Sequence, residues 1–326
     1  TINQSIPFPT TFKEEKNLGM EKGKLSQIES ELLIRDLSQK LALSFDQYGF
    51  VQAEIQYLKS LDSSLNILEE KSKIRFELQD ISRLDYSLIQ TKRMRLSNDI
   101  SLLESDLMGE KRKIASLLKL DENSFVIQQT VYQKQLNIFQ TGVTDEHPMM
   151  RWYKQNEGIY LQEKKVNLAH QLPEINLGYF NQTLVGIQNV SGVDTEFTQA
   201  NRFQGYMVGA NVPLFWGAYK NRNEATAVSM QQNNLEKEQT TQALQREFSQ
   251  LADRLNLLSG SIDKLGGQLT NELRFLTDDA KAKFEVGEIS FIEFLQIQQQ
   301  RSELELSYLH LINQYNQTSI QLNWYR

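Results

Sequence analysis

Residues 76–82 read FELQDIS and residues 284–290 read FEVGEIS, two similar stretches separated by 284 − 76 = 208 positions. A second pair of stretches lies upstream, where IPF at 6–8 corresponds to VPL at 212–214 at an offset of 206. Between these anchors a mostly apolar ladder recurs at an offset of 207. It comprises Leu37, Leu41, Ser44, Tyr48, Val51, Ile55 and Leu58, and then Leu244, Phe248, Leu251, Leu255, Leu258, Ile262 and Leu265. We interpret this pattern as an internal two-fold repeat of a strand–helix–turn–helix unit.

The ladder residues are spaced alternately by three and four positions, which is typical of coiled-coil-like helices. Residues 13–76 contain no proline, and a helix of that length would span roughly 95 Å at 1.5 Å per residue. A turn at 77–82 and a further apolar seam from Leu96 to Leu117 complete a helical hairpin. We therefore predict a first long hairpin over residues 13–120 and a second over residues 217–326.

Residues 1–12 and 173–216 contain segments that alternate apolar and polar side chains, as strands with one apolar face do. The expected apolar faces carry Ile2 and Ile6, then Ile175, Leu177 and Tyr179, and then Tyr206, Val208 and Ala210. A polar loop over about 188–202 would join the last two strands into a hairpin. Proline and tryptophan mark the junctions between strands and helices, at Pro7, Pro173, Pro213 and Trp216.

Two further segments lie between the hairpins. Residues 121–148 mix short apolar alternations with Gly142, which indicates a compact connecting region. Pro148 then favours the start of a shorter helix, over 149–172, which ends at Leu172-Pro173. The predicted fold class is mainly α with a small β part.

Oligomerisation would resolve two problems that this arrangement poses. Long helices with two apolar stripes cannot bury both in one hairpin, and isolated strands have open edges. In a ring of subunits the strands close into a barrel and the helices close into a tube.

Net charge, missing motifs and the spacing of the histidines argue against several classes of function. The net charge of −6 argues against a nucleic-acid partner. No nucleophile elbow, phosphate-binding loop or dinucleotide fingerprint occurs, so the sequence does not predict an enzyme or a cofactor. His147, His170 and His310 are far apart, and there is no cysteine, so we predict no metal site. The adjacent Met149 and Met150 do not share a helix face and are better explained by packing.

Three motifs resemble, in the same order, those of the TolC-like outer-membrane efflux factor family. HPMMRWYKQNEGIYLQEKKVNLAHQLPEINLGYF, from His147, is similar to the family's helix-to-strand passage. GYMVGANVPLFWGAYKNRNEATA, from Gly205, is similar to its strand-to-helix passage, with Phe215, Gly217 and Arg222. KFEVGEISFIEFLQIQ, from Lys283, is similar to its periplasmic tip, while the first tip has Gln79 where glycine is usual.

The resemblance covers essentially the whole chain and implies a function. It implies a homotrimer in the outer membrane of a Gram-negative cell, in contact with outer-membrane lipid. The strands would form one 12-stranded transmembrane β-barrel, and the hairpins would form an α-barrel that crosses the periplasm. A periplasmic adaptor protein and an inner-membrane pump of the RND type would be the partners, and small molecules or metal ions would be exported passively. The repeat also leads us to expect a further helix and strand upstream of Thr1, so that this chain is N-terminally truncated.

The resemblance places adaptor docking and gating at the two tips. The candidate residues there are Phe76, Asp80, Ser82, Arg83, Asp85, Phe284, Gly287, Glu288, Ser290 and Glu293. The four carboxylates could form rings that filter cations or gate the pore, or they could simply cap the helices that begin there. Arg75, Arg83 and Lys283 could hold a closed tip through ion pairs, which would require a network because exposed pairs contribute little.

A soluble coiled-coil scaffold without channel activity is the alternative interpretation. It explains the heptads equally well, but it does not explain strands that share one apolar face beside a Val-Pro-Leu-Phe-Trp run. A scaffold should remain monodisperse without detergent, whereas a channel should need it. The exported substrate and the partner pump are not predicted by the sequence.

Overall fold

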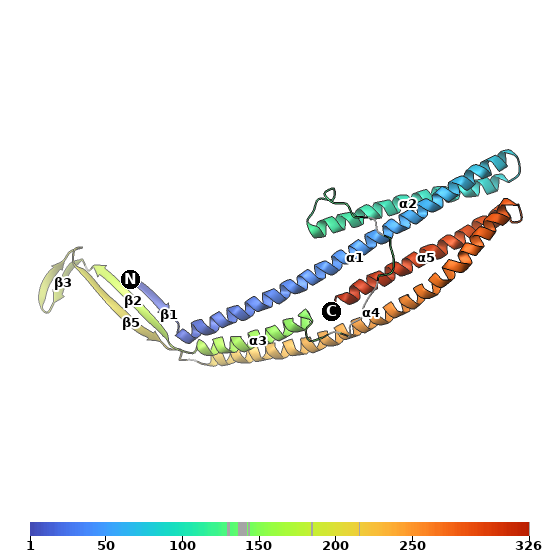
Figure 1. The fold of residues 1–326 in the computed structure, drawn as a ribbon. Helices are drawn as coiled ribbons and strands as arrows, with labels where there is room; N and C mark the ends of the chain where they lie inside the picture. Colours follow the sequence, from blue (N-terminus) through green and yellow to red (C-terminus); the bar gives the residue numbers. More distant parts are fainter. Residues whose placement is uncertain (129–130, 136–141, 143, 184, 215, 326) are drawn as a thin grey trace. The chain divides into compact units, whose positions relative to one another are not determined.

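The computed structural model describes residues 1–128, 131–135, 142, 144–183, 185–214 and 216–325, without the side chains of 268–275 and 277. Phe215 and part of the predicted connecting region therefore lie outside the described residues. The elements are β1 (Ile2–Ile6), α1 (Pro9–Glu77), α2 (Arg83–Leu118), α3 (Pro148–Ala169), β2 (Glu174–Thr183), β3 (Gly186–Val190), β4 (Val193–Phe197), β5 (Arg202–Asn211), α4 (Gly217–Glu285) and α5 (Phe291–Asn323) (Figure 1).

The elements group into two compact units. The strand unit comprises Thr1–Leu32 and Thr144–Gln242, and the hairpin unit comprises Leu33–Val143 and Ala243–Arg326. Helices α1 and α4 contribute to both units. No helix in the described part of the chain combines the length and the apolar character that crossing a membrane requires.

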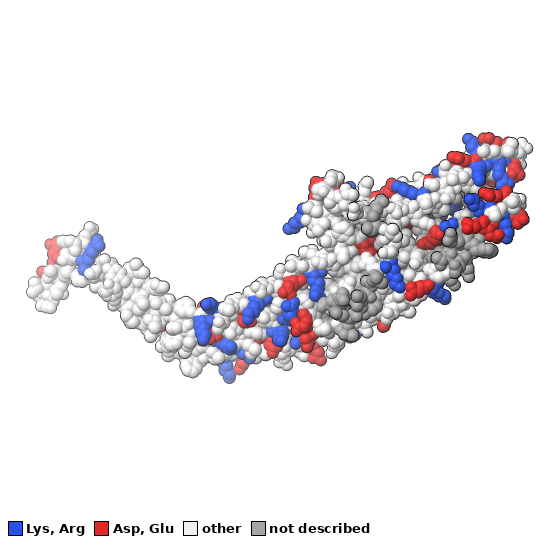
Figure 2. Space-filling model, viewed as in Figure 1, with Lys and Arg blue, Asp and Glu red and all other residues white. Residues whose placement is uncertain are grey.

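The strand unit contains an antiparallel sheet in the order β1-β2-β5. Its register places Leu177 opposite Val208 and Tyr179 between Ile2 and Tyr206, so the three predicted apolar faces form one surface. This surface is exposed: Tyr206 and Val208 are 86% and 79% accessible. Residues 1–12, 175–193 and 203–219 contain no charged side chain, and Figure 2 shows this part of the molecule free of Lys, Arg, Asp and Glu.

The prediction of a polar loop between β2 and β5 is wrong in one respect, because this segment forms a second hairpin, β3–β4. Ser191 and Gly192 form its two-residue turn with φ of 54° and 90°, the positive values that tight hairpin turns require. Asn189 closes the turn by donating from Nδ2 to Asp194 and by accepting from the Gly192 N–H. The polarity of these residues hid their alternation.

Helix α3 lies between α1 and the first part of α4. On the α1 side, Gln162 donates to both the carbonyl and the carboxylate of Glu14, at 3.1 and 2.6 Å. Gln155 does the same with Glu21, at 3.0 and 2.6 Å. On the α4 side, Asn233 donates to the carbonyl of Tyr153. These hydrogen bonds hold α3 against α1 and α4 at several points along its length.

The hairpin unit buries most of the predicted apolar ladders. Near the tips, one core joins all four long helices: Leu58, Leu65, Leu68, Ile89, Leu96, Ala280, Phe291, Phe294 and Leu295. A second core joins α4 to α5 through Leu255, Leu258, Ile262, Ile312, Tyr315 and Leu322. Leu37, at the start of the first ladder, is instead 42% exposed.

Residues 131–135, in the predicted connecting region, are tied to both hairpins. The Tyr132 hydroxyl donates to Asp46 of α1 at 2.9 Å. Fully buried Asn316 of α5 accepts from the Gln135 N–H and donates to the Gln133 carbonyl. This segment therefore links α1 to α5 by polar contacts.

Helix boundaries differ by a few residues from the predicted segment limits: the short helix predicted over 149–172 is Pro148–Ala169. Helix α1 begins at Pro9, whereas the predicted hairpin begins at residue 13. Proline is well suited to a first helical position because the N–H that it lacks would have no partner inside the helix. The division of the chain into barrel, connecting region and hairpins stays a prediction.

Candidate functional site: the hairpin tips and the strand–helix junctions

The two tips have the same backbone hydrogen bonds. At the first tip, Asp80 N–H donates to the Arg75 carbonyl at 2.8 Å and Gln79 N–H donates to the Phe76 carbonyl at 3.0 Å. At the second tip, Glu288 and Gly287 donate to Lys283 and Phe284 at 2.8 and 3.2 Å. These are the 6→1 and 5→2 bonds of a Schellman motif. Gln79 takes the left-handed conformation that Gly287 takes at the second tip.

The helices that follow both tips begin with a capping box. Ser82 accepts from the Asp85 N–H at 3.1 Å, and its own N–H donates to the Asp85 carboxylate at 3.1 Å. Ser290 and Glu293 repeat this arrangement at 3.2 and 2.7 Å. The bonds from Ser290 lower the pKa of Glu293. Asp85 and Glu293 are therefore engaged in capping, the simpler of the two roles that the sequence allowed.

The other two tip carboxylates are not engaged in capping. Asp80 forms an ion pair with Arg75 at 2.6 Å. Glu288 is exposed, and its charge is among the causes that raise the pKa of Lys283, after the bond from that lysine to Asp279. The Arg75–Asp80 ion pair lies within the first hairpin, and the Lys283–Asp279 ion pair lies within the second. Arg83 is exposed and makes no ion pair with the described residues.

Aromatic rings form the apolar part of the tips. Phe76 stacks on Tyr86 with ring centroids 5.6 Å apart, and Phe284 stacks on Phe294 at 4.7 Å. The Arg75 guanidinium lies 5.7 Å from the Phe284 ring centroid, a cation–π contact between the hairpins. Arg75 therefore connects the first tip to the second.

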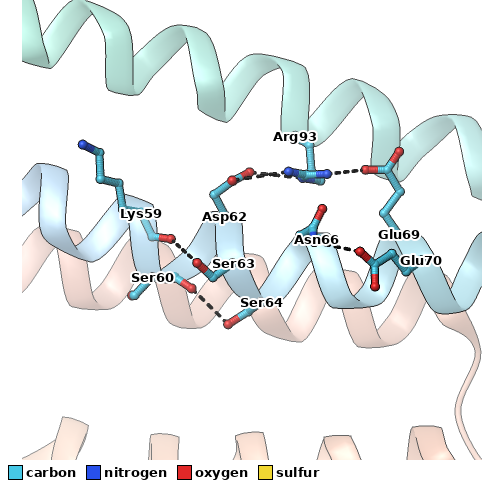
Figure 3. A network of polar contacts seen from close by, with 9 residues as sticks. All are labelled: Lys59, Ser60, Asp62, Ser63, Ser64, Asn66, Glu69, Glu70 and Arg93. Carbon is cyan, nitrogen blue, oxygen red and sulfur yellow. Dashed lines mark hydrogen bonds and ion pairs between the residues drawn. The ribbon is translucent and has the colours of Figure 1, made fainter.

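Arg93 of α2 was not predicted as part of this region. Its guanidinium bridges two carboxylates of α1: Nε lies 3.1 Å from Asp62 and Nη1 lies 2.7 Å from Glu69 (Figure 3). These bonds raise the pKa of Arg93. The predicted turn at 77–82 could have indicated these contacts, because residues equidistant from a turn face each other in an antiparallel hairpin.

The four predicted junction residues lie where strands meet helices. Pro7 separates β1 from α1, and Pro173 immediately precedes β2. Trp216 lies between β5 and α4, 65% exposed, and its indole N–H donates to the Pro213 carbonyl at 2.8 Å. This bond fixes the orientation of an exposed aromatic ring.

The described residues contain no group of three or more metal-ligating side chains. His147 is fully buried and caps α3 by accepting from the Met149 N–H at 3.2 Å. His170 and His310 each lie beside a single carboxylate, Glu15 and Glu54.

Comparison with solved structures identifies the fold. A membrane protein from Pseudomonas aeruginosa superposes with a TM-score of 0.80 at 14% identity, over 99% of this chain and 74% of that one. The Campylobacter jejuni CmeC outer membrane channel gives 0.76 at 11% identity, over 99% and 69%. The open state of the Neisseria gonorrhoeae MtrE outer membrane channel gives 0.74 at 11% identity, over 96% and 71%.

The chain has the TolC-like outer-membrane channel fold. No sequence-family model and no curated protein matches it. At identities of 11–14%, the likeness to these structures concerns the fold alone.

Proposed function

We propose that the chain is a subunit of an outer-membrane exit duct, through which small molecules or metal ions leave the cell passively. The observation that carries this proposal is the β1-β2-β5 sheet. Its apolar surface is exposed and uncharged, and its strands continue through Pro7 and Trp216 into 69-residue helices. An exposed apolar surface of this kind marks contact with a membrane or a protein. The likeness to outer-membrane channels supports the membrane.

Three copies would complete the duct. The sheet has open edges at β1 and β5, and pairing between copies would satisfy them and close a barrel. The hairpins of three subunits would form the tube across the periplasm. In this arrangement the protein would lie in the outer membrane of a Gram-negative cell.

The tips would be the docking and gating region, where a periplasmic adaptor and an inner-membrane pump of the RND type connect. Of the charged residues predicted for docking and gating, Asp80, Arg83 and Glu288 are not engaged in capping. The Arg75–Asp80 pair and the Arg75–Phe284 contact would hold the two tips of a subunit together in the closed state.

Conductance in planar bilayers tests this function. The protein should insert from detergent and give steps of low conductance. Arg75→Ala should increase them severalfold because it removes both tip contacts, while Lys59→Ala, which removes an exposed pair with Glu104, should not. Failure of the parent and of Arg75→Ala to conduct would contradict a duct. If the protein also remained monodisperse without detergent, the soluble scaffold would be favoured instead.

A further inference from the structure

The strand unit has a groove directly below the sheet, between the end of α3 and the start of α4. Its volume is about 640 Å³. The groove is lined on the α3 side by Lys164 and Leu168 and on the α4 side by Trp216, Lys220, Glu224 and Ala227, among others. We call it the junction groove, and none of its lining residues belongs to the tips.

The lining residues change from apolar to basic along the groove. Trp216 lies at the end next to the sheet, and Leu168 follows, 65% and 54% exposed. Lys220 lies one helical turn beyond Trp216, and Lys164 lies one turn beyond Leu168. With about 1.5 Å per residue, Lys220 is roughly 6 Å further from the sheet than Trp216. Apart from Gln171, the lining near the sheet is therefore apolar, and both lysines lie further from the sheet, with Glu224 one turn beyond Lys220.

The charges in the groove are not balanced. Lys220 lies 3.9 Å from Glu224, a weak ion pair. Lys164 is half-buried and has no ion pair or hydrogen bond to any described residue. Two lysines against one glutamate leave the lining one unit positive. A groove whose lining carries an excess of positive charge favours an anionic ligand.

We propose that the junction groove binds one anionic phospholipid. Its phosphate would lie between Lys164 and Lys220, and its acyl chain would run past Leu168 and Trp216 onto the apolar surface of the sheet. This inference rests on the proposed function, which places that surface in a bilayer. The order of groups matches a lipid in the adjoining leaflet, because Trp side chains prefer the headgroup level and long lysines extend their charge toward it.

Fluorescence quenching by brominated lipids tests the proposal. The full-length protein is reconstituted in phosphatidylcholine vesicles that contain either brominated phosphatidylglycerol or brominated phosphatidylcholine. The signal of Trp216 is the difference between the parent and Trp216→Phe. We expect the anionic probe to be preferred severalfold, and Lys164→Gln should reduce that preference about fivefold.

Lys165→Gln is the matched control, because Lys165 is the next residue of α3 and does not line the groove. It should leave the preference unchanged. Native mass spectrometry of detergent-extracted protein provides a measurement independent of tryptophan: the parent should retain phosphatidylglycerol, and Lys164→Gln should lose it.

Three results would overturn the inference. Equal quenching by both probes would show no anionic preference, and an unchanged Lys164→Gln would show that the groove does not bind the headgroup. If neither probe quenched Trp216 while the protein still conducted, the groove would be closed to lipid, as it would be under a second copy of the chain. Only this inference would then fail, and the proposed function would stand. Absence of both quenching and conductance would contradict the proposed function as well.

Discussion

Gln79 and Gly287 occupy the same backbone position at the two tips, with φ of 60° and 80°. In both, the residue that follows donates its N–H back to a carbonyl five positions earlier. A glycine adopts this conformation without strain, whereas a residue with a side chain does not. The first tip therefore carries a backbone strain that the second lacks.

Gln79→Gly should stabilise the first tip by about 1 kcal/mol, and Gly287→Ala should destabilise the second by a similar amount. Hydrogen exchange of the amides around each tip measures both changes. Gly260→Ala is the control: it lies within α4 with open space around its Cα, so it should stabilise the helix by up to about 1 kcal/mol. Equal effects of the two alanine substitutions would contradict the argument.

Arg93→Lys should destabilise the first hairpin by about 1 kcal/mol, because an ammonium cannot bridge Asp62 and Glu69 as the planar guanidinium does. Urea unfolding in detergent measures the change. Lys59→Met removes a more exposed pair and should change stability by less than about 0.5 kcal/mol. A loss no larger for Arg93→Lys than for Lys59→Met would show that the bridge contributes nothing special.

Asp46 should make stability depend on pH. Burial raises its pKa, and the bonds from Tyr132, Asn316 and Gln317 only partly offset this. Because the folded-state pKa lies above the unfolded value, Asp46 contributes stability that is complete below about pH 3.9 and is lost as the pH rises through the folded-state value.

Asp46→Asn removes this titration. Unfolding free energies measured from pH 3.5 to 7 should therefore fall less with rising pH in Asp46→Asn than in the parent. Asp253→Asn, at an exposed position of α4, should follow the parent. Identical pH profiles for Asp46→Asn and the parent would contradict a buried, ionised Asp46.

Gly205→Ala should destabilise the sheet by about 1–3 kcal/mol, as overpacking does. A Cβ at Gly205 would lie 2.7 Å from the ring of Phe180, the residue opposite it on β2. Thermal unfolding in detergent measures the cost, and Phe180→Leu in the same background should recover part of it. Gly209→Ala, where the nearest atom lies at 3.9 Å, should be nearly neutral by comparison.

Much of the fold followed from local patterns. The seams at three- and four-residue spacing predicted the long helices, and the alternation at Leu177 and Val208 predicted strands whose apolar faces coincide. The tip motifs with Ser82 and Ser290 predicted where the second helix of each hairpin begins. The β3–β4 hairpin was missed because its residues are polar, and its turn depends on the positive φ of Ser191 and Gly192.

Periodicity and capping chemistry are properties of neighbouring residues, and so the order, type and approximate ends of the elements could be predicted without a structure. Contacts between distant residues could not. Whether Arg75 reaches Phe284 depends on how the helices pack. The same holds for the unpaired Lys164, which becomes informative only because folding places it beside Trp216 across two helices. Burial, charge balance and side-chain direction are set by that packing.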